Sequence, residues 1–181
     1  MRSSESASSE SASGESAWSP TALSEPGDPR AGAGTAVLPT AADTIALGAQ
    51  LGGRLRAGDV VVLSGPLGAG KTVLAMGIAQ GMDVEGPVTS PTFVLARVHR
   101  PRTPGSAVMV HVDVYRLLDQ AGDLPAELDA LDLDTDLDDA VVVVEWGEGL
   151  AERLAERHLR IDLQRQADTD TRTATWRWST P

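Results

Sequence analysis

A glycine-rich segment that follows an apolar run restricts the fold of this chain more than any other feature of the sequence. The segment reads Gly65-Pro66-Leu67-Gly68-Ala69-Gly70-Lys71-Thr72. Residues 59–64 before it are mostly β-branched and apolar, which is typical of a short strand buried on both faces. Residues from Lys71 to about Met82 have the pattern of a helix. A strand, a glycine-rich loop and a helix in this order predict an α/β fold built around a phosphate-binding P-loop.

The spacing inside the segment also predicts its chemistry. The two outer glycines, the lysine and the threonine occupy every fixed position of the Walker A pattern. Glycine lets the backbone wrap so that successive N–H groups point at phosphates, and the helix that follows adds the positive end of its dipole. Lys71 is expected to reach the β- and γ-phosphates, and the Thr72 hydroxyl is a hard oxygen ligand that suits Mg²⁺. We therefore expect every residue from Gly65 to Thr72 to contact bound ATP.

Composition strengthens the assignment of this loop. The chain has 15 basic residues, and Lys71 is the only lysine among them. A phosphate cradle needs a compact and flexible point charge, which a planar guanidinium does not supply. The alternative is a glycine-rich turn that ends in Lys-Thr by chance, which this composition makes rare. No Asn-Lys-x-Asp stretch of the kind that reads guanine is present, so ATP is favoured over GTP.

The first 36 residues differ in composition from the rest of the chain. Ser, Glu, Ala, Gly and Pro dominate them, and Trp18 is their only large side chain. Such a segment cannot bury enough apolar area to offset the entropy lost on ordering. We expect a disordered tail over residues 1–36 and one P-loop domain over residues 37–181, because 181 residues suit a single core.

The rest of the sequence predicts alternating helices and strands. Thr40 and Asp43 form a capping box at the start of a helix, which Gly58 is expected to end. Further strands are expected over residues 92–98, 108–115 and 140–146, further helices near residues 124–131 and 150–156, and a final β-hairpin over residues 158–166 and 171–178. The prediction is a mixed sheet of P-loop NTPase type, flanked by helices, with a C-terminal β-hairpin.

Two apolar runs end in a carboxylate, as expected of a Walker B strand. Residues 108–112 precede Asp113, and residues 141–144 precede Glu145. Either acid could lie beside the phosphates at the carboxyl edge of the sheet and hold the metal. His111 interrupts the first run and has no His or Cys at metal-binding spacing, so we assign it no role. The residues alone leave the choice between the two acids open.

Charge and composition exclude several classes of protein. The net charge of −11 argues against direct binding of nucleic acid, which needs a basic surface. The chain has no cysteine, so it has neither a disulfide framework nor a thiolate metal site. No run approaches the roughly 20 apolar residues that span a bilayer. The residues after Met1 lack the apolar region of a secretory signal. We expect a cytoplasmic protein that does not enter a membrane.

Four short segments occur in order along the chain: Gly65–Thr72, Ser90-Pro91-Thr92-Phe93, His111-Val112-Asp113-Val114-Tyr115-Arg116-Leu117 and Val144-Glu145-Trp146. Together they resemble the TsaE (YjeE) family of bacterial P-loop ATPases, over about residues 38–179. That family serves biosynthesis of the threonylcarbamoyl modification on the adenosine beside the tRNA anticodon. The resemblance implies that ATP hydrolysis supports multiple turnovers in company with a heterodimer of the TsaD and TsaB subunits. It also implies that tRNA is reached only through those partners.

The resemblance implies roles for individual residues. Thr72 and Glu145 would be the Mg²⁺ ligands, while Asp113 would be a further acid needed for hydrolysis, beside Lys71. Two further threonines would lie near the nucleotide, one in a switch-like segment near the γ-phosphate and one near the adenine: Thr92 and Thr44.

The chain departs from the family pattern at two positions, and two other functions compete. Pro66 stands where many relatives have Asp, and Val73 stands where many have a second Thr. A small-molecule kinase with the same loop would need an acceptor pocket and usually an Arg-rich lid, but no Arg cluster follows the P-loop helix. A non-hydrolysing, ATP-dependent binding module is the other alternative.

Overall fold

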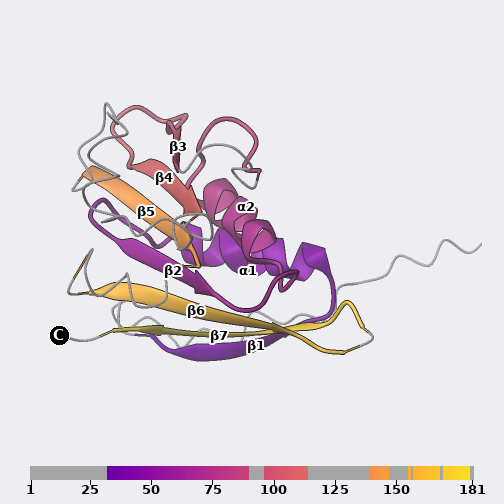
Figure 1. Cartoon of the computed structure of the whole chain (residues 1–181). Coiled ribbons are helices and arrows are strands. Elements are labelled where there is room, and N and C mark those ends of the chain that lie inside the picture. The colour runs from indigo at the N-terminus through magenta and orange to yellow at the C-terminus, as the bar shows by residue number, and fades with distance from the viewer. Residues whose placement is uncertain are drawn as a thin grey trace, which may run out of the picture.

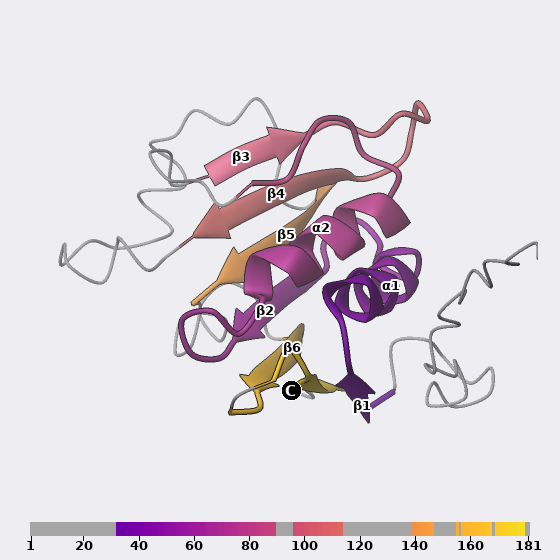
Figure 2. The same ribbon diagram turned by 90° about the vertical axis from the view of Figure 1, so that its right-hand side faces the viewer.

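The described part of the chain forms one seven-stranded sheet with two helices on one of its faces (Figure 1 and Figure 2). The computed structural model describes residues 32–89, 96–113, 139–146, 155, 157–167 and 169–179. The strands are β1 (Gly34–Leu38), β2 (Val60–Ser64), β3 (Ala96–His99), β4 (Val108–Asp113), β5 (Ala140–Glu145), β6 (His158–Arg165) and β7 (Arg172–Trp178). The helices are α1 (Ala41–Gly52) and α2 (Lys71–Gly81). Across the sheet the strand order is β1-β7-β6-β2-β5-β4-β3.

The sheet contains both parallel and antiparallel pairs, as the sequence predicted. Three neighbouring pairs are parallel: β6 with β2, β2 with β5, and β5 with β4. β7 pairs antiparallel with β1 and β6, and β3 pairs antiparallel with β4. The predicted C-terminal hairpin is therefore confirmed as β6 and β7. Because β2, β4 and β5 are parallel, their carboxyl ends meet at one edge of the sheet, where ligands bind in open α/β sheets.

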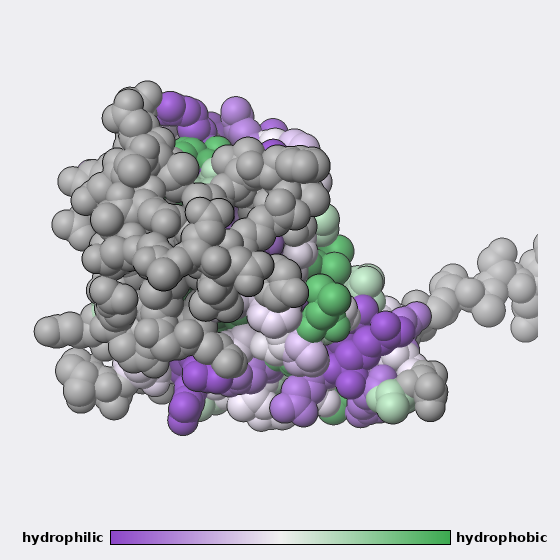
Figure 3. Space-filling view, viewed as in Figure 1, coloured by the Kyte–Doolittle hydropathy of each residue, from purple (hydrophilic) through white to green (hydrophobic). Residues whose placement is uncertain are grey.

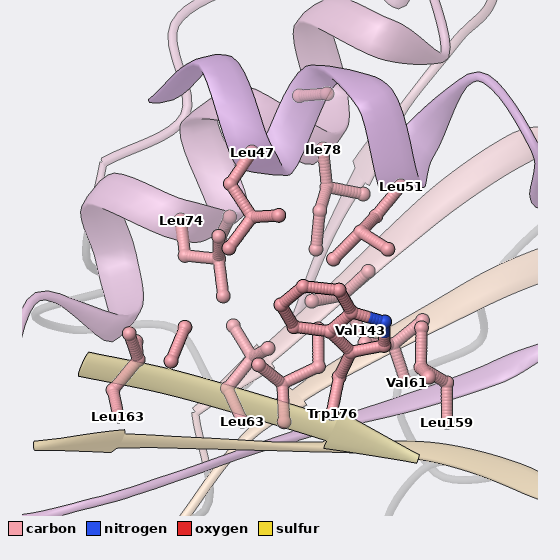
Figure 4. Close-up of a cluster of buried hydrophobic side chains, with 14 of the residues drawn as sticks. Leu47, Leu51, Val61, Leu63, Leu74, Ile78, Val143, Leu159, Leu163 and Trp176 are labelled. Carbon is pink, nitrogen blue, oxygen red and sulfur yellow. The ribbon is translucent and has the colours of Figure 1, made fainter. Parts of the chain in front are cut away.

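The inner strands are buried on both faces, which explains their continuous apolar sequence. Every residue of β2 and β5 is buried. On one face the helices cover the sheet, and the labelled side chains of Figure 4 come from both layers: Leu47, Leu51, Leu74 and Ile78 from the helices, and Val61, Leu63, Val143, Leu159, Leu163 and Trp176 from the strands. A second cluster fills the other face and includes Val60, Val62, Val110, Val142 and Val144.

Helix α1 begins as predicted but ends earlier. Thr40 accepts a hydrogen bond from the Asp43 N–H at 3.2 Å, and the Thr40 N–H donates to Asp43 Oδ2 at 2.9 Å, so the capping box is present. The expectation that the helix continues to Gly58 is wrong. The last helical residue is Gly52, and the Gly53 N–H donates to the Ala49 carbonyl as the helix ends. The helix therefore ends before the chain reaches Gly58, and Gly53 follows it with a right-handed φ of −65°.

The other differences from prediction lie at the ends of elements. β1 begins at Gly34, so the folded part includes residues 34–36, which we had assigned to the tail. These small residues carry little hydrophobic signal, and pairing with β7 provides their hydrogen bonds. β3 covers Ala96–His99, whereas a strand was expected over 92–98, and residues 90–95 lie outside the described part. The helices expected near 124–131 and 150–156 also fall outside it, apart from residue 155.

Most large apolar side chains of the described residues are turned inward. Val37 and Leu67 are the exceptions, with 55% and 84% of their surface exposed. Among the coloured residues of Figure 3, a green hydrophobic group lies to the right of centre and borders purple hydrophilic residues. In the described part of the chain, no helix is long and apolar enough to cross a membrane.

Glycines let the two helices approach each other closely. Gly48 and Gly52 lie one turn apart in α1, as Gly77 and Gly81 do in α2. A Cβ atom on Gly77 would overlap the Ile45 carbonyl oxygen, and one on Gly81 would overlap that of Ala49. The backbones of the two helices are therefore in direct contact. This contact fixes α2, and with it the loop that precedes α2.

Replacing Gly77 with alanine is expected to destabilise the protein, although alanine is the better helix former by about 1 kcal/mol. The added Cβ forces the helices apart, and overpacking of this kind typically costs about 1–3 kcal/mol. Denaturant unfolding measures the change. Gly53→Ala is the matched control, because its Cβ meets no atom closer than 3.5 Å and its φ of −65° suits alanine. Equal stability of the Gly77→Ala variant and wild type would contradict the close contact.

Candidate nucleotide-binding site

The glycine-rich loop connects the carboxyl end of β2 with the first residue of α2 (Figure 2). Gly65, Gly68 and Gly70 have φ values of 134°, 78° and 103°, which L-residues with side chains rarely adopt. A Cβ atom on Gly65 would also overlap the Leu163 carbonyl oxygen of β6. The glycines of the Walker A pattern are thus required by backbone conformation and by close packing against the sheet.

The Lys71 ammonium is held inside this loop. Only 5% of the residue is exposed, and Nζ donates to the carbonyl oxygens of Gly65 at 2.7 Å and Pro66 at 3.0 Å. Nζ also lies 3.5 Å from the centre of the Trp146 ring, which is a cation–π contact. Burying an ammonium without partners would cost several kcal/mol, so these contacts are what allow the lysine to be buried here.

Trp146 is brought to Lys71 by an unusual turn of the backbone. Its φ is 64°, in the left-handed region that non-glycine residues seldom occupy. The Trp146 N–H donates to the Leu63 carbonyl at 3.1 Å, which fixes the turn to the end of β2. Conformations of this kind cost about 1–3 kcal/mol and cluster at functional sites. The strain falls at the residue that follows Glu145.

Glu145 is the residue that connects the strands with the loop. It is 3% exposed, and each of its carboxylate oxygens has a partner. The Thr72 hydroxyl donates to Oε2 at 3.1 Å, and His111 Nε2 lies 2.9 Å from Oε1. Because a carboxylate can only accept, Nε2 carries the proton in this pair. The fully buried imidazole thus fixes the carboxylate, and the carboxylate faces the last residue of the Walker A pattern.

Asp113 ends the neighbouring strand beside Glu145. The two residues are register partners of β4 and β5, and Leu63 of β2 is the register partner of Glu145 on its other side. Asp113 is half-buried, whereas Glu145 is buried. Both candidate acids therefore reach the edge where the loop lies. Of the two acids, Glu145 is the one that accepts the hydrogen bond of the Thr72 hydroxyl.

The remaining predicted residues fall in different surroundings. Ala69 is buried and its N–H donates to the Pro66 carbonyl, while Leu67 is largely exposed. Thr44 is fully buried within α1, and its hydroxyl donates to the Thr40 carbonyl at 3.3 Å. Thr92 lies outside the described residues. The proximity of Thr44 to an adenine and of Thr92 to a γ-phosphate stays a prediction.

Sequence reasoning missed three contacts of this site. His111 was given no role, although it is the only polar residue inside its strand before Asp113 and lies two positions from that acid. The same alternation that places Asp113 on one face of β4 places His111 there. Trp146 was named only as part of the segment Val144-Glu145-Trp146. Arg172 was not considered, and it donates from Nε to the Ala69 carbonyl at 3.1 Å.

Replacing His111 with leucine is expected to lower the free energy of unfolding by about 1–3 kcal/mol, since Glu145 Oε1 is then buried without its donor. His158→Leu is the matched control. His158 is 6% exposed and its Nδ1 pairs with the neutral Ser179 hydroxyl, so its loss should cost less. A double-mutant cycle with Glu145→Gln should give a coupling energy of about 0.5–3 kcal/mol. Additive effects of the two substitutions would show that the pair is not coupled.

Comparison with known proteins adds independent information. The family model described as "Threonylcarbamoyl adenosine biosynthesis protein TsaE" matches residues 38–174. Two relatives share the name "tRNA threonylcarbamoyladenosine biosynthesis protein TsaE". The one from Mycobacterium tuberculosis (strain H37Rv) is 72% identical over 81% of this chain and 88% of its own length. The one from Streptomyces coelicolor is 55% identical over 66% of this chain and 77% of its own length.

A solved structure supports the fold. The crystal structure of Bacillus subtilis YdiB matches with a TM-score of 0.61, over 83% of this chain and 88% of that chain. Its sequence identity is 24%, so this likeness concerns the fold alone. The family match covers nearly all of the folded part, and relatives of high identity carry the same family name. The chain therefore belongs to the TsaE family of P-loop proteins.

Proposed function

We propose that this protein is an ATP-binding and ATP-hydrolysing subunit of the system that attaches threonylcarbamoyl to the tRNA adenosine beside the anticodon. It acts in the cytoplasm together with TsaD and TsaB subunits. The observation that carries the proposal is the contact of Thr72 with Glu145, which joins the Walker A loop to a strand-end carboxylate. The names of the relatives connect those proteins with tRNA threonylcarbamoyladenosine biosynthesis.

The end of the phosphate loop fits a Mg²⁺ ion. The Thr72 hydroxyl and a Glu145 carboxylate oxygen are 3.1 Å apart, and both are the hard oxygen ligands that Mg²⁺ prefers. Mg²⁺ usually binds through one or two carboxylates together with phosphates and water, and when bound it neutralises charge on the phosphates. In this proposal Thr72 and Glu145 hold the ion, while His111 restrains the carboxylate through its other oxygen.

Lys71 exchanges its partners when ATP binds. The described ammonium donates to two carbonyls of its own loop. Phosphate oxygens carry negative charge and attract the ammonium more strongly than neutral carbonyl oxygens do, so the β- and γ-phosphates are better acceptors than these carbonyls. The loop thus keeps the lysine close to its working position before the nucleotide arrives. The proposed role of Lys71 is to stabilise phosphate charge during binding and hydrolysis.

Asp113 is proposed to act in hydrolysis and not as the principal metal ligand. It lies at the half-buried end of β4, beside Glu145 in the sheet. His111, two residues earlier, bonds with Glu145 at 2.9 Å, and Glu145 is also the acid that Thr72 contacts. A second carboxylate at this edge is suited to orient the attacking water. In this proposal Glu145 binds the metal and Asp113 acts in catalysis.

In this proposal the partner subunits contact the tRNA, and this chain does not. The net charge of −11 opposes direct contact with a phosphate backbone, so the partners supply the basic surface. The test is ATP turnover by the purified protein alone and after addition of the TsaD and TsaB subunits. We expect slow turnover alone and a marked increase in the complex. A nucleotide-dependent complex without turnover would indicate a binding module, and phosphate transfer to a small molecule would indicate a kinase.

Mg-ATP should stabilise the wild-type protein against heat. At about 100 times the dissociation constant, binding contributes ~2.7 kcal/mol. For a folded part of this size that is roughly 5–10 °C in melting temperature. Lys71→Ala should remove most of the shift, because the phosphates lose the only lysine of the chain. Lys71→Arg should also lose most of the shift in melting temperature, since a planar guanidinium does not fit the cradle.

Arg177→Ala removes an exposed cation of β7 and is the control that should keep the full shift. Mg-GTP should give a smaller shift than Mg-ATP. If Lys71→Ala kept the wild-type shift, the assignment of the phosphate site would be wrong.

A titration with ATP in the presence and absence of Mg²⁺ should distinguish the roles of Glu145 and Asp113. Glu145→Ala is expected to lose the Mg²⁺ dependence of binding, because a metal ligand belongs to the ground-state complex. Asp113→Ala should bind Mg-ATP nearly as well as wild type but hydrolyse it poorly in the assembled complex. Loss of the Mg²⁺ dependence in Asp113→Ala, with Glu145→Ala unaffected, would reverse the two roles.

A further inference from the structure

Arg172, the first residue of β7, lies against the phosphate loop although the two are far apart in the sequence. Its Nε donates to the Ala69 carbonyl oxygen at 3.1 Å. A Cβ atom built on Gly70 would lie 2.8 Å from Arg172 Nε and 3.3 Å from Cδ. The arginine side chain therefore fills the space that any other residue at position 70 would need. Glycine is therefore required at position 70 for two reasons: the close approach of Arg172, and a φ of 103°.

The contact acts on one peptide group of the loop. The described residues contain no cis peptide, so the carbonyl of Ala69 and the N–H of Gly70 point in opposite directions. Arg172 holds the carbonyl, so the Gly70 N–H points in the opposite direction, away from the arginine. In a P-loop the backbone N–H groups are the donors that surround the phosphates. A charged donor on the carbonyl also polarises the amide and strengthens its N–H as a donor.

The β6–β7 hairpin holds the arginine in place. Nη1 of Arg172 donates to the Asp170 carbonyl at 2.6 Å. Arg165 is its register partner on β6, and it donates to the Thr169 carbonyl and to Asp170 Oδ1, each at 2.9 Å. Both arginines thus brace the same turn. Of the two, Arg172 is the one that extends to the phosphate loop.

We propose that Arg172 is a positioning residue of the phosphate loop. It fixes the Ala69–Gly70 peptide in the orientation that binds phosphate, and it places a positive charge beside the loop. This proposal rests on the ATP-binding function proposed above. Arg172 acts through the loop backbone and does not itself need to touch the nucleotide.

The first test compares affinities for Mg-ATP by titration of the full chain. Arg172→Gln should weaken binding about tenfold, the loss expected for one hydrogen bond to a charged group. Arg172→Lys keeps the charge and one donor, so it should recover part of the affinity. Arg165→Gln is the matched control, since it removes the partner arginine of the same turn but no contact with Ala69. It should bind Mg-ATP as wild type does.

The second test needs no nucleotide. In an amide NMR spectrum of the free protein, the Gly70 signal should move in Arg172→Gln and stay in Arg165→Gln, because only the first substitution changes the hydrogen bond to its peptide. An unmoved Gly70 signal with unchanged affinity in Arg172→Gln would overturn the proposal. Equal losses in both variants would also overturn it, since they would point to the hairpin fold and not to the contact. If wild type bound no ATP, the proposed function would fail, while a shifted Gly70 signal would still support the coupling.

Discussion

Two buried side chains of opposite charge type, Lys71 and Glu145, lie at the carboxyl edge of the sheet, and the arrangement of the site depends on them. They are 5% and 3% exposed, whereas most buried side chains of the described residues are apolar. Burial of such groups is tolerated only when they have partners, so each one fixes the groups around it. Lys71 holds the loop carbonyls and faces Trp146, while Glu145 holds Thr72 and His111. These contacts join the loop and the first turn of α2 to the strands β4 and β5.

The helices and the hairpin support the same edge from two sides. The glycine contact between α1 and α2 fixes the helix that begins at Lys71. On the other side, the Leu163 carbonyl packs against Gly65, and Arg172 bonds to the Ala69 carbonyl. The phosphate loop is therefore held at both of its ends before a ligand is bound. Because such a site is already ordered, less free energy is lost to ordering the loop when a ligand binds.

Much of the fold could be predicted because its signals are local. The Walker A spacing, the Thr40–Asp43 capping box and the apolar strand before Glu145 each lie within a few residues, and each was confirmed as a structural element. What was missed depends on contacts between distant residues. β1 is a strand only because β7 pairs with it, and His111 acquires a partner only because β4 and β5 lie in register. The Arg172 contact joins residues that the sequence separates by about a hundred positions, so no local pattern reveals it.

We propose that Thr72 and Glu145 together hold the metal of a bound nucleotide. The most direct measurement is a crystal structure with a slowly hydrolysed ATP analogue and Mn²⁺ in place of Mg²⁺, in which anomalous scattering locates the ion. We predict one ion beside the Thr72 hydroxyl and the Glu145 carboxylate, with Lys71 moved from its loop carbonyls to the phosphates. An ion held by Asp113 while Thr72 still bonds to Glu145 would contradict it, as would a nucleotide bound away from the loop.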